Sequence, residues 1–181
     1  MAKQFIFFII GLPCSGKSSI AEYLCERYDC VHLSTEQIRA NILGINHEDV
    51  DCDFTVQQQG EVYDKINEEF DCLLKNAKSV IVDGVYRSIR RRNEIFEIAS
   101  RYVSLKNVFA YCITCDEGVA KQRLVDRKKK GTVAPAGVKG YQKIKSEFEQ
   151  VDSNMFVEID NTGNLDYAIN TIISDIEKRV L

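Results

Sequence analysis

A glycine-rich loop between an apolar run and a helical pattern constrains the fold of this 181-residue chain more than any other feature. The run Phe5–Ile10 has the length and composition of a buried strand, and the octapeptide GLPCSGKS (residues 11–18) follows it directly. After the loop, apolar residues recur every four positions at Ile20, Leu24 and Tyr28, which indicates a helix. The loop fits the pattern GxxxxGK[ST] in the strand–loop–helix context that a phosphate cradle requires.

The chemistry of a phosphate cradle explains the residue types in this loop. Glycines let the backbone turn its N–H groups toward an anion, and the helix N-terminus adds partial positive charge. Lys17 is expected to reach the β- and γ-phosphates of a nucleotide, and the Ser18 hydroxyl is expected to bind Mg²⁺. The loop residues expected to contact the nucleotide are Gly11, Pro13, Cys14, Ser15, Gly16, Lys17, Ser18 and Ser19. A glycine-rich turn without a ligand is the alternative, and the flanking strand and helix argue against it.

The apolar N-terminus also resembles a short secretory signal, which would make Cys14 a lipidation site. Three features argue against a signal: its basic region would consist of Lys3 alone, no small-residue cleavage site follows, and an amphipathic segment comes next. We therefore expect a cytoplasmic protein whose seven cysteines are reduced thiols. The pair Cys112 and Cys115 forms a lone CxxC without further ligands in paired spacing, so a buried strand end is favoured over a zinc site.

Five apolar runs alternate with helical patterns along the chain and predict an α/β fold. The runs are Phe5–Ile10, Val31–Leu33, Val80–Val82, Val108–Ile113 and Phe156–Ile159. Strands in this pattern form a parallel sheet covered by helices on both faces, with ligands bound at the carboxyl ends of the strands. We expect a single domain over residues 1–181. The net charge of −3 gives no general attraction to nucleic acid or anionic membranes, and no apolar run approaches the ~20 residues that span a bilayer.

The segment after the second run carries an acid and an arginine that could act on an acceptor. Residues 34–37, Ser-Thr-Glu-Gln, resemble a helix capping box, so Glu36 and Arg39 are expected in the first turns of a helix. A carboxylate there can accept a hydroxyl proton, and an arginine one turn later can hold a phosphate in a bidentate manner. A first-turn acid that favours the helix dipole, paired with an arginine at i+3, explains the spacing equally well.

An acid ends the third run, and an arginine cluster follows it. Asp83 can orient Mg²⁺ or contact a substrate, although a strand-ending Asp-Gly turn is an equal alternative. The cluster consists of Arg87, Arg90, Arg91 and Arg92. Such a cluster is more often a solvated helix face than a binding surface.

A pair of arginines after the fourth run is typical of a closing lid. Arg123 and Arg127 are four residues apart and leave one face of a helix. The stretch Gly131–Gly140, with Pro135 and three glycines, is expected to be a mobile excursion. Together these features predict a lid over about residues 117–140 that excludes water and brings cations to a transferring phosphoryl group. A charged surface helix is the alternative.

Nearly the whole chain resembles the small P-loop kinases of the polynucleotide kinase, zeta toxin and chloramphenicol phosphotransferase group. Five matches carry the resemblance: GLPCSGKSS to their phosphate loop, LSTEQIR to their S-x-[DE]-x-[IL]-R element, SVIVDG with Arg92 to their third-strand acid and downstream arginine, RLVDR to their lid, and EIDNTGNLDYAI to their last strand and closing helix. The resemblance implies a P-loop NTPase fold of the nucleoside-monophosphate-kinase type, with five parallel strands, the first of them central, and a short lid. The sequence contains no Asn-Lys-x-Asp motif, which GTP-binding switches usually carry.

The resemblance also implies roles for individual residues. Glu36 takes the general-base position, where polynucleotide kinases carry Asp, and Arg39 would grip phosphate beside it. The other implied contacts are lid cations at Arg123 and Arg127, a metal- or substrate-binding acid at Asp83, substrate-binding arginines at Arg87 and Arg92, and neighbours of the nucleotide base at Asn161 and Thr162. The implied cofactors are ATP and Mg²⁺, and the implied acceptor bears a hydroxyl, at a nucleic acid 5′ end or on a small molecule.

Two features bear on the alternatives to a polynucleotide kinase. The stretch Ile45–Gly60 is acidic and suits a nucleic-acid phosphate track poorly, because like charges repel. A small-molecule kinase of the same fold is therefore the main alternative. A non-enzymatic ATP-binding module is a third, although the acids and arginines at the strand ends exceed what binding alone requires.

Overall fold

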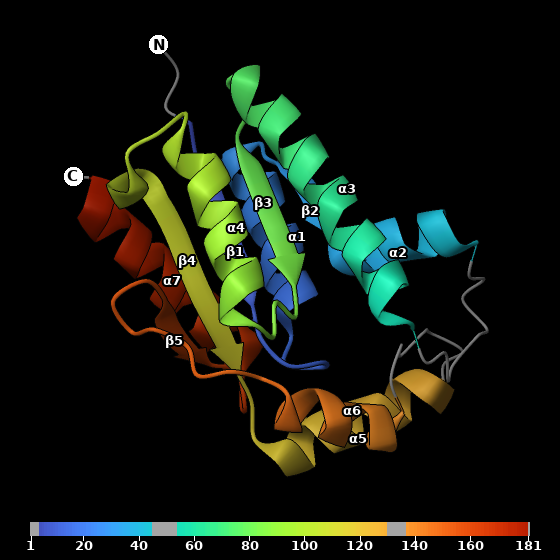
Figure 1. Cartoon of the computed structure of the whole chain (residues 1–181). Coiled ribbons are helices and arrows are strands. Elements are labelled where there is room, and N and C mark those ends of the chain that lie inside the picture. Colours follow the sequence, from blue (N-terminus) through green and yellow to red (C-terminus); the bar gives the residue numbers. More distant parts are fainter. Residues whose placement is uncertain (1–3, 45–53, 130–136, 181) are drawn as a thin grey trace.

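The computed structural model of the chain describes residues 4–44, 54–129 and 137–180. Strands and helices alternate along them as the sequence predicts (Figure 1). In chain order the elements are β1 (Ile6–Ile10), α1 (Lys17–Tyr28), β2 (Val31–Ser34), α2 (Thr35–Leu43), α3 (Val56–Lys75), β3 (Val80–Gly84), α4 (Ile89–Ser100), the 3₁₀ turn η1 (Leu105–Asn107), β4 (Val108–Thr114), α5 (Glu117–Lys129), α6 (Val138–Ser146), β5 (Val157–Asp160) and α7 (Leu165–Val180).

The five strands form one parallel sheet in the order β2-β3-β1-β4-β5. This confirms the predicted fold class and the central place of the first strand. Non-sequential neighbours in a parallel sheet need crossover connections, and the helices supply them on the two faces. All five carboxyl ends therefore meet at one edge of the sheet.

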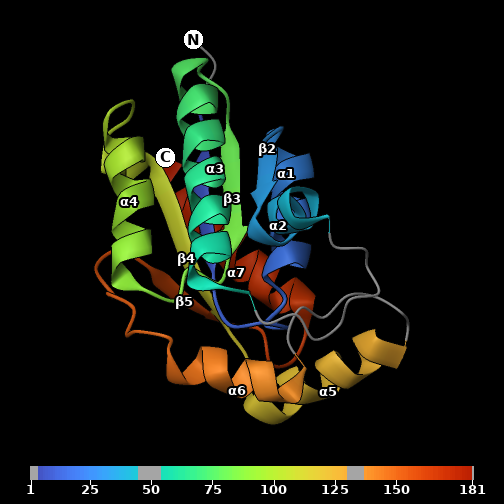
Figure 2. The same cartoon turned by 45° about the vertical axis from the view of Figure 1, so that its right-hand side comes forward.

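The alternating side chains of β1 divide the apolar core into two layers. Phe8 and its even-numbered neighbours pack with residues of α3 and α4, whereas Phe7 and Ile9 pack with residues of α1 and α7. Figures 1 and 2 show these helix pairs on opposite faces of the sheet. Every residue of β1 is fully buried, and burial of one large apolar side chain stabilises a fold by about 1.5–3 kcal/mol. The strand that leads into the phosphate loop is thus firmly fixed.

Helices α5 and α6 lie across the carboxyl edge of the sheet (Figures 1 and 2). Residues 131–136 of the predicted mobile excursion lie outside the described residues, and its last part forms the start of α6. Tyr141 of α6 is fully buried in a small apolar cluster with Cys14, Ala120 and Leu124. Within the predicted lid, residues 117–129 form α5 and residues 138–140 begin α6, which is an element that the sequence patterns did not indicate.

The expected capping box at the start of α2 is wrong. Ser34 is the N-cap residue of α2, but its side chain accepts no capping hydrogen bond and instead lines a cavity. A capping box forms at α3, where the Thr55 hydroxyl accepts from the N–H of Gln58 and the Gln58 side chain accepts from the N–H of Thr55. In the part of the chain that the structure describes, no helix combines the length and the apolar character needed to cross a membrane.

Candidate active site

The loop after β1 adopts the backbone of an anion cradle. Gly11 and Gly16 have φ values of 146° and 95°, in the region that favours glycine. A Cβ atom on Gly16 would lie 2.1 Å from Nδ2 of Asn161, and that amide donates a hydrogen bond to the Ser15 carbonyl at 2.8 Å. Asn161, at the end of β5, therefore holds the loop against the sheet from the far side.

Asp83 faces the start of the helix that follows the loop. The register of the sheet places Asp83 beside Ile9 on one side and Ser34 on the other, at the carboxyl edge. Its Oδ2 atom accepts a hydrogen bond from the Ser18 hydroxyl at 2.9 Å and lies 3.5 Å from Nε2 of His32. The carboxylate is 2% exposed, and its Oδ1 atom has no hydrogen-bond partner among the described residues. A buried carboxylate oxygen without a partner, beside a serine hydroxyl, fits the oxygen ligands that Mg²⁺ prefers.

Glycine at position 84 lets α2 approach the same edge. A Cβ atom on Gly84 would lie 2.5 Å from Cγ2 of Thr35, so a larger residue would push α2 away from β3. Glu36 lies in the first turn of α2 and Arg39 in the second, and both line the cavity that faces the loop. The structure thus brings the expected base position and its neighbouring arginine to the phosphate loop.

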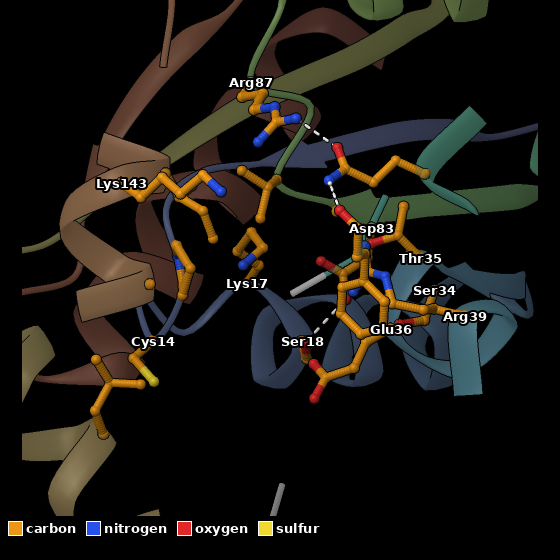
Figure 3. Close-up of a pocket in the computed structure, with 18 of the residues that line it drawn as sticks. Cys14, Lys17, Ser18, Ser34, Thr35, Glu36, Arg39, Asp83, Arg87 and Lys143 are labelled. Carbon is orange, nitrogen blue, oxygen red and sulfur yellow. Dashed lines mark hydrogen bonds between the residues drawn. The ribbon is translucent and has the colours of Figure 1, made fainter. Parts of the chain in front are cut away.

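A main cavity of about 410 Å³ joins these groups (Figure 3). It is lined by Lys17 and Ser18 of the loop, by Asp83 at the end of β3, and by Glu36 and Arg39 of α2. The Lys17 ammonium donates to the Leu12 carbonyl at 3.2 Å, within its own loop. One cavity therefore contains a phosphate cradle and a separate carboxylate.

Arg39 is held by stacking and not by a counter-ion. Its guanidinium lies 5.1 Å from the centre of the Phe54 ring, and it has no hydrogen bond or ion pair to another described residue. Burial removes water from this cation and lowers the pKa of Arg39 below its usual value. A half-buried guanidinium whose Nε has no hydrogen-bond partner among the described residues favours a negatively charged ligand.

A second cavity of about 380 Å³ lies on the other side of the loop. Arg123, Asn161 and Leu165 line it, and Arg127 lines both cavities. The Arg123 guanidinium donates to the carbonyls of Asn161 at 2.9 Å and Cys14 at 3.4 Å. Arg123 and Arg127, the two arginines of the predicted lid, therefore lie beside the phosphate loop.

Two residues expected at the site have other contacts. The Thr162 hydroxyl accepts from the N–H of Asp116 at 2.9 Å and donates to Asp160, and Thr162 is not among the described residues that line the two cavities. The Arg92 guanidinium is 3% exposed and donates only to backbone carbonyls, those of Tyr86, Arg87, Glu149 and Gln150. Arg92 therefore connects α4 to the segment before β5 and does not face the main cavity, whereas Arg87 does.

Several residues that line the main cavity were missed by the sequence analysis. Phe54 precedes α3, Gln59 and Tyr63 lie in its first turns, and Lys139 and Lys143 come from α6. Tyr63 appears in the sequence as one more apolar position of a helix, so nothing separated it from the core. The i,i+4 spacing of the two lysines was a usable signal, but it falls in a segment with three glycines that indicated a loop.

The strand order, the loop geometry and the carboxylate beside the loop together define the class of P-loop kinases. The family model described as "AAA domain" (AAA_33) matches residues 6–151, and the chain belongs to this family. A kinase domain of this class uses a nucleoside triphosphate with a divalent cation.

A curated relative and three solved structures agree with this class. The chain is 25% identical to adenylate kinase isoenzyme 5 from Bos taurus over 135 residues, which are 71% of this chain and 23% of that protein. The chain thus spans about a quarter of the length of the curated relatives of this type.

The solved structures cover the chain more fully. A gluconokinase from Sinorhizobium meliloti 1021 has a TM-score of 0.69 at 17% identity and covers 98% of this chain and 94% of its own. The APS kinase from Mycobacterium tuberculosis, in complex with AMPPNP and APS, has a TM-score of 0.68 at 14% identity, with 98% and 99% covered. A chain of the Pnkp1/Rnl/Hen1 RNA repair complex has a TM-score of 0.59 at 18% identity, with 82% and 47% covered. At these identities the likeness shows the fold, and the resemblance to small P-loop kinases is confirmed.

Proposed function

We propose that the protein transfers the γ-phosphoryl group of ATP to a hydroxyl of an acceptor bound in the main cavity. The observation that carries this proposal is the shared lining of that cavity. Lys17 and Ser18 of the phosphate loop lie on one wall and Glu36 of α2 lies on another. A phosphate cradle and a free carboxylate in one cavity are the two parts that phosphoryl transfer to an alcohol requires.

The donor half of the site binds and neutralises the phosphates. The loop N–H groups, Lys17, Arg123 and Arg127 supply positive charge around the cradle. Ser18 and Asp83 would hold Mg²⁺, directly or through water, because the Asp83 carboxylate has a buried oxygen without a partner. When bound, Mg²⁺ neutralises charge on the phosphate oxygens.

The acceptor half is defined by Glu36. A hydroxyl must lose its proton as it attacks phosphorus, and a nearby carboxylate can accept that proton. A phosphate acceptor is already ionised, and its attacking oxygen would be repelled by the same carboxylate. Glu36 therefore favours an alcohol as the attacking group over the phosphate of a nucleotide.

The walls of the cavity favour a small acceptor. Gln59 and Tyr63 of α3 and two lysines of α6 bound the acceptor half on different sides. A polynucleotide 5′ end is the second candidate, because the same basic lining would also attract a phosphodiester chain. A steep loss of binding with rising salt separates a long phosphate track from a small ligand.

The proposal is tested by incubating the protein with γ-labelled ATP and a panel of acceptors: sugars, sugar acids, nucleosides, aminocyclitol-like alcohols and 5′-hydroxyl oligonucleotides. Glu36→Gln should lower the transfer rate to the preferred acceptor by about 100-fold, which is typical for removal of a general base, while ATP affinity is unchanged. Glu26→Gln, an exposed change on α1, is the control. Equal transfer rates for Glu36→Gln and the parent would reject the base, and a panel without any labelled acceptor would reject the kinase.

A further inference from the structure

The main cavity carries more positive than negative side chains. Its basic lining residues are Lys17, Arg39, Arg87, Arg127, Lys139 and Lys143, and its acidic lining residues are Glu36 and Asp83. In the proposed function, Lys17 and Arg127 at the phosphate loop bind the triphosphate, and Asp83 binds the metal. Among the described lining residues, four cations then remain in the acceptor half beside the Glu36 carboxylate.

These four cations come from three separate elements. Arg39 lies on α2, Arg87 follows β3, and Lys139 and Lys143 lie one turn apart on α6. Both lysines line the main cavity and neither lines the second cavity, where Arg123 and Asn161 lie. Figure 3 shows the Lys143 side chain extending from its helix toward the middle of the cavity, on the side where Arg87 lies. The lysines are therefore placed with the acceptor residues.

The contacts of Arg39 and Arg87 show which of them needs a ligand. Arg87 is paired with Glu147 and also donates to Gln59, whose own amide donates to the Phe54 carbonyl at 3.0 Å. Arg39 stacks on the Phe54 ring, and its buried Nε has no hydrogen-bond partner among the described residues. Hydrogen bonds and an ion pair therefore fix Arg87 in the cavity wall, whereas the buried Nε of Arg39 has no hydrogen-bond partner among the described residues.

We propose that Arg39, Arg87, Lys139 and Lys143 form an anion subsite for the acceptor, so that the acceptor is a small alcohol that carries its own phosphate or carboxylate group. This inference rests on the proposed function and names its substrate class. The bound anionic group fixes the molecule, and a separate hydroxyl of the same molecule is presented to Glu36. The hydroxyl proton passes to Glu36, the hydroxyl oxygen bonds to the γ-phosphorus, and the bond from that phosphorus to the bridging oxygen breaks to release ADP.

The size of the cavity limits this acceptor. The volume of about 410 Å³ is shared with the terminal phosphates of the donor. It lies near the lower end of the range for small-molecule sites, roughly 300–1,000 Å³. A sugar acid or a sugar phosphate has the size and the charge that this space requires.

The first test compares acceptors that differ only in charge. D-gluconate is paired with sorbitol and ribose 5-phosphate with ribose, in the same γ-labelled ATP assay, and a 5′-hydroxyl oligonucleotide forms a separate arm. At least one anionic member should exceed its neutral partner in kcat/KM by about tenfold or more, because charge-assisted contacts are worth about 1.5–3 kcal/mol. A preference for gluconate over sorbitol would indicate a carboxylate subsite, and a preference for ribose 5-phosphate over ribose would indicate a phosphate subsite. Equal use of neutral partners, or use of the oligonucleotide alone, overturns the inference and leaves the kinase intact.

The second test does not depend on turnover. Calorimetry measures the affinity of inorganic phosphate, and of acetate, for the protein saturated with AMPPNP and Mg²⁺. The double change Lys139→Gln, Lys143→Gln should weaken the binding of the responding anion by about tenfold and leave AMPPNP affinity unchanged. Lys178→Gln removes the same charge from an exposed position on α7 that lines neither cavity, and it should have no such effect.

The outcomes of the second test separate the two proposals. Unchanged anion affinity in the double variant overturns the subsite, because the lysines would then not bind the anion. Weakened AMPPNP binding with unchanged anion affinity also overturns it, because the lysines would then bind the nucleotide donor. A weakened anion site in a protein that labels no acceptor upholds the subsite and rejects hydroxyl transfer.

Discussion

Two arginines near the carboxyl edge of the sheet, the buried Arg92 and the half-buried Arg39, differ in what satisfies their charge. Arg92 donates to four backbone carbonyls at 2.6–3.0 Å and stacks 5.0 Å from the Phe148 ring. Arg39 stacks on a ring as well but has no hydrogen bond to a described residue. A guanidinium that donates four hydrogen bonds to the backbone stabilises the fold, whereas one with a free donor at a cavity is available to a ligand.

Arg92→Met should therefore destabilise the protein without changing catalysis in the folded fraction. Four backbone carbonyls would lose this donor, and we expect the free energy of unfolding to fall by about 2–4 kcal/mol in urea titration. Arg90→Met, at a side chain that is 76% exposed, is the matched control and should change stability little. A raised acceptor KM at unchanged stability would show instead that Arg92 binds substrate.

At the scale of elements, α6 covers the phosphate loop through one aromatic side chain. Tyr141 packs against Cys14 of the loop and against Ala120 and Leu124 of α5. Burial raises the pKa of the Cys14 thiol, although nearby cations oppose this shift. The helix therefore covers the loop and keeps this cysteine in its unreactive, protonated form.

Tyr141→Ala should expose Cys14 to alkylation. Loss of the ring opens the apolar cluster, so iodoacetamide should modify Cys14 severalfold faster at neutral pH, as measured by peptide mass spectrometry. Cys72, which is exposed on α3, is the internal control and should react at the same rate in both proteins. Equal protection of Cys14 in the variant would mean that α6 does not seal the loop.

An exposed ionic network joins α5 to α6. The Glu117 carboxylate accepts hydrogen bonds from Lys121 on its own helix and from Gln142 and Lys145 on α6, and these donors lower its pKa to about 2. The folded-state pKa lies below the ordinary value of 4.5, so the link is complete above pH 4.5 and is lost as the pH falls toward 2.

Glu117→Gln should therefore loosen α6 in a pH-dependent way. Hydrogen exchange of the α6 amides, corrected for intrinsic rates, should be faster in the variant than in the parent at pH 6. The difference should shrink as the pH is lowered below 4.5 and should also shrink in high salt, because the network is exposed. A difference that persists at low pH would assign the link to packing instead of charge.

The elements and the site were not equally predictable from the sequence. The strands and most helices were predictable because the period of their apolar residues follows directly from burial. The phosphate loop was predictable because its residue spacing is specific. Helix α6 was not, since Gly137 and Gly140 disfavour a helix and its stability comes from the contact of Tyr141 with residues distant in sequence. For the same reason the lysines of α6 were missed. Arg92 was expected at the site from the resemblance alone, and its contacts to the carbonyls of Glu149 and Gln150 join positions far apart in sequence.

At the scale of the whole molecule, the parallel sheet explains why residues from six segments meet. Each crossover returns the chain to the same edge, so the ends of β1, β2, β3 and β5 and the helices α5 and α6 contribute to one surface. Local structure alone does not bring these segments together. The cavity is thus a property of the topology, and its chemistry comes from side chains placed at the strand ends.

The most direct test of this account is the ratio of phosphorylated acceptor to ADP formed in a single reaction. If the cradle and Glu36 serve one transfer, each ADP should be matched by one phosphorylated acceptor, and Glu36→Gln should slow both together while ATP still binds. ADP that accumulates without phosphorylated product at every acceptor would contradict the account and indicate a nucleotide-hydrolysing binding module.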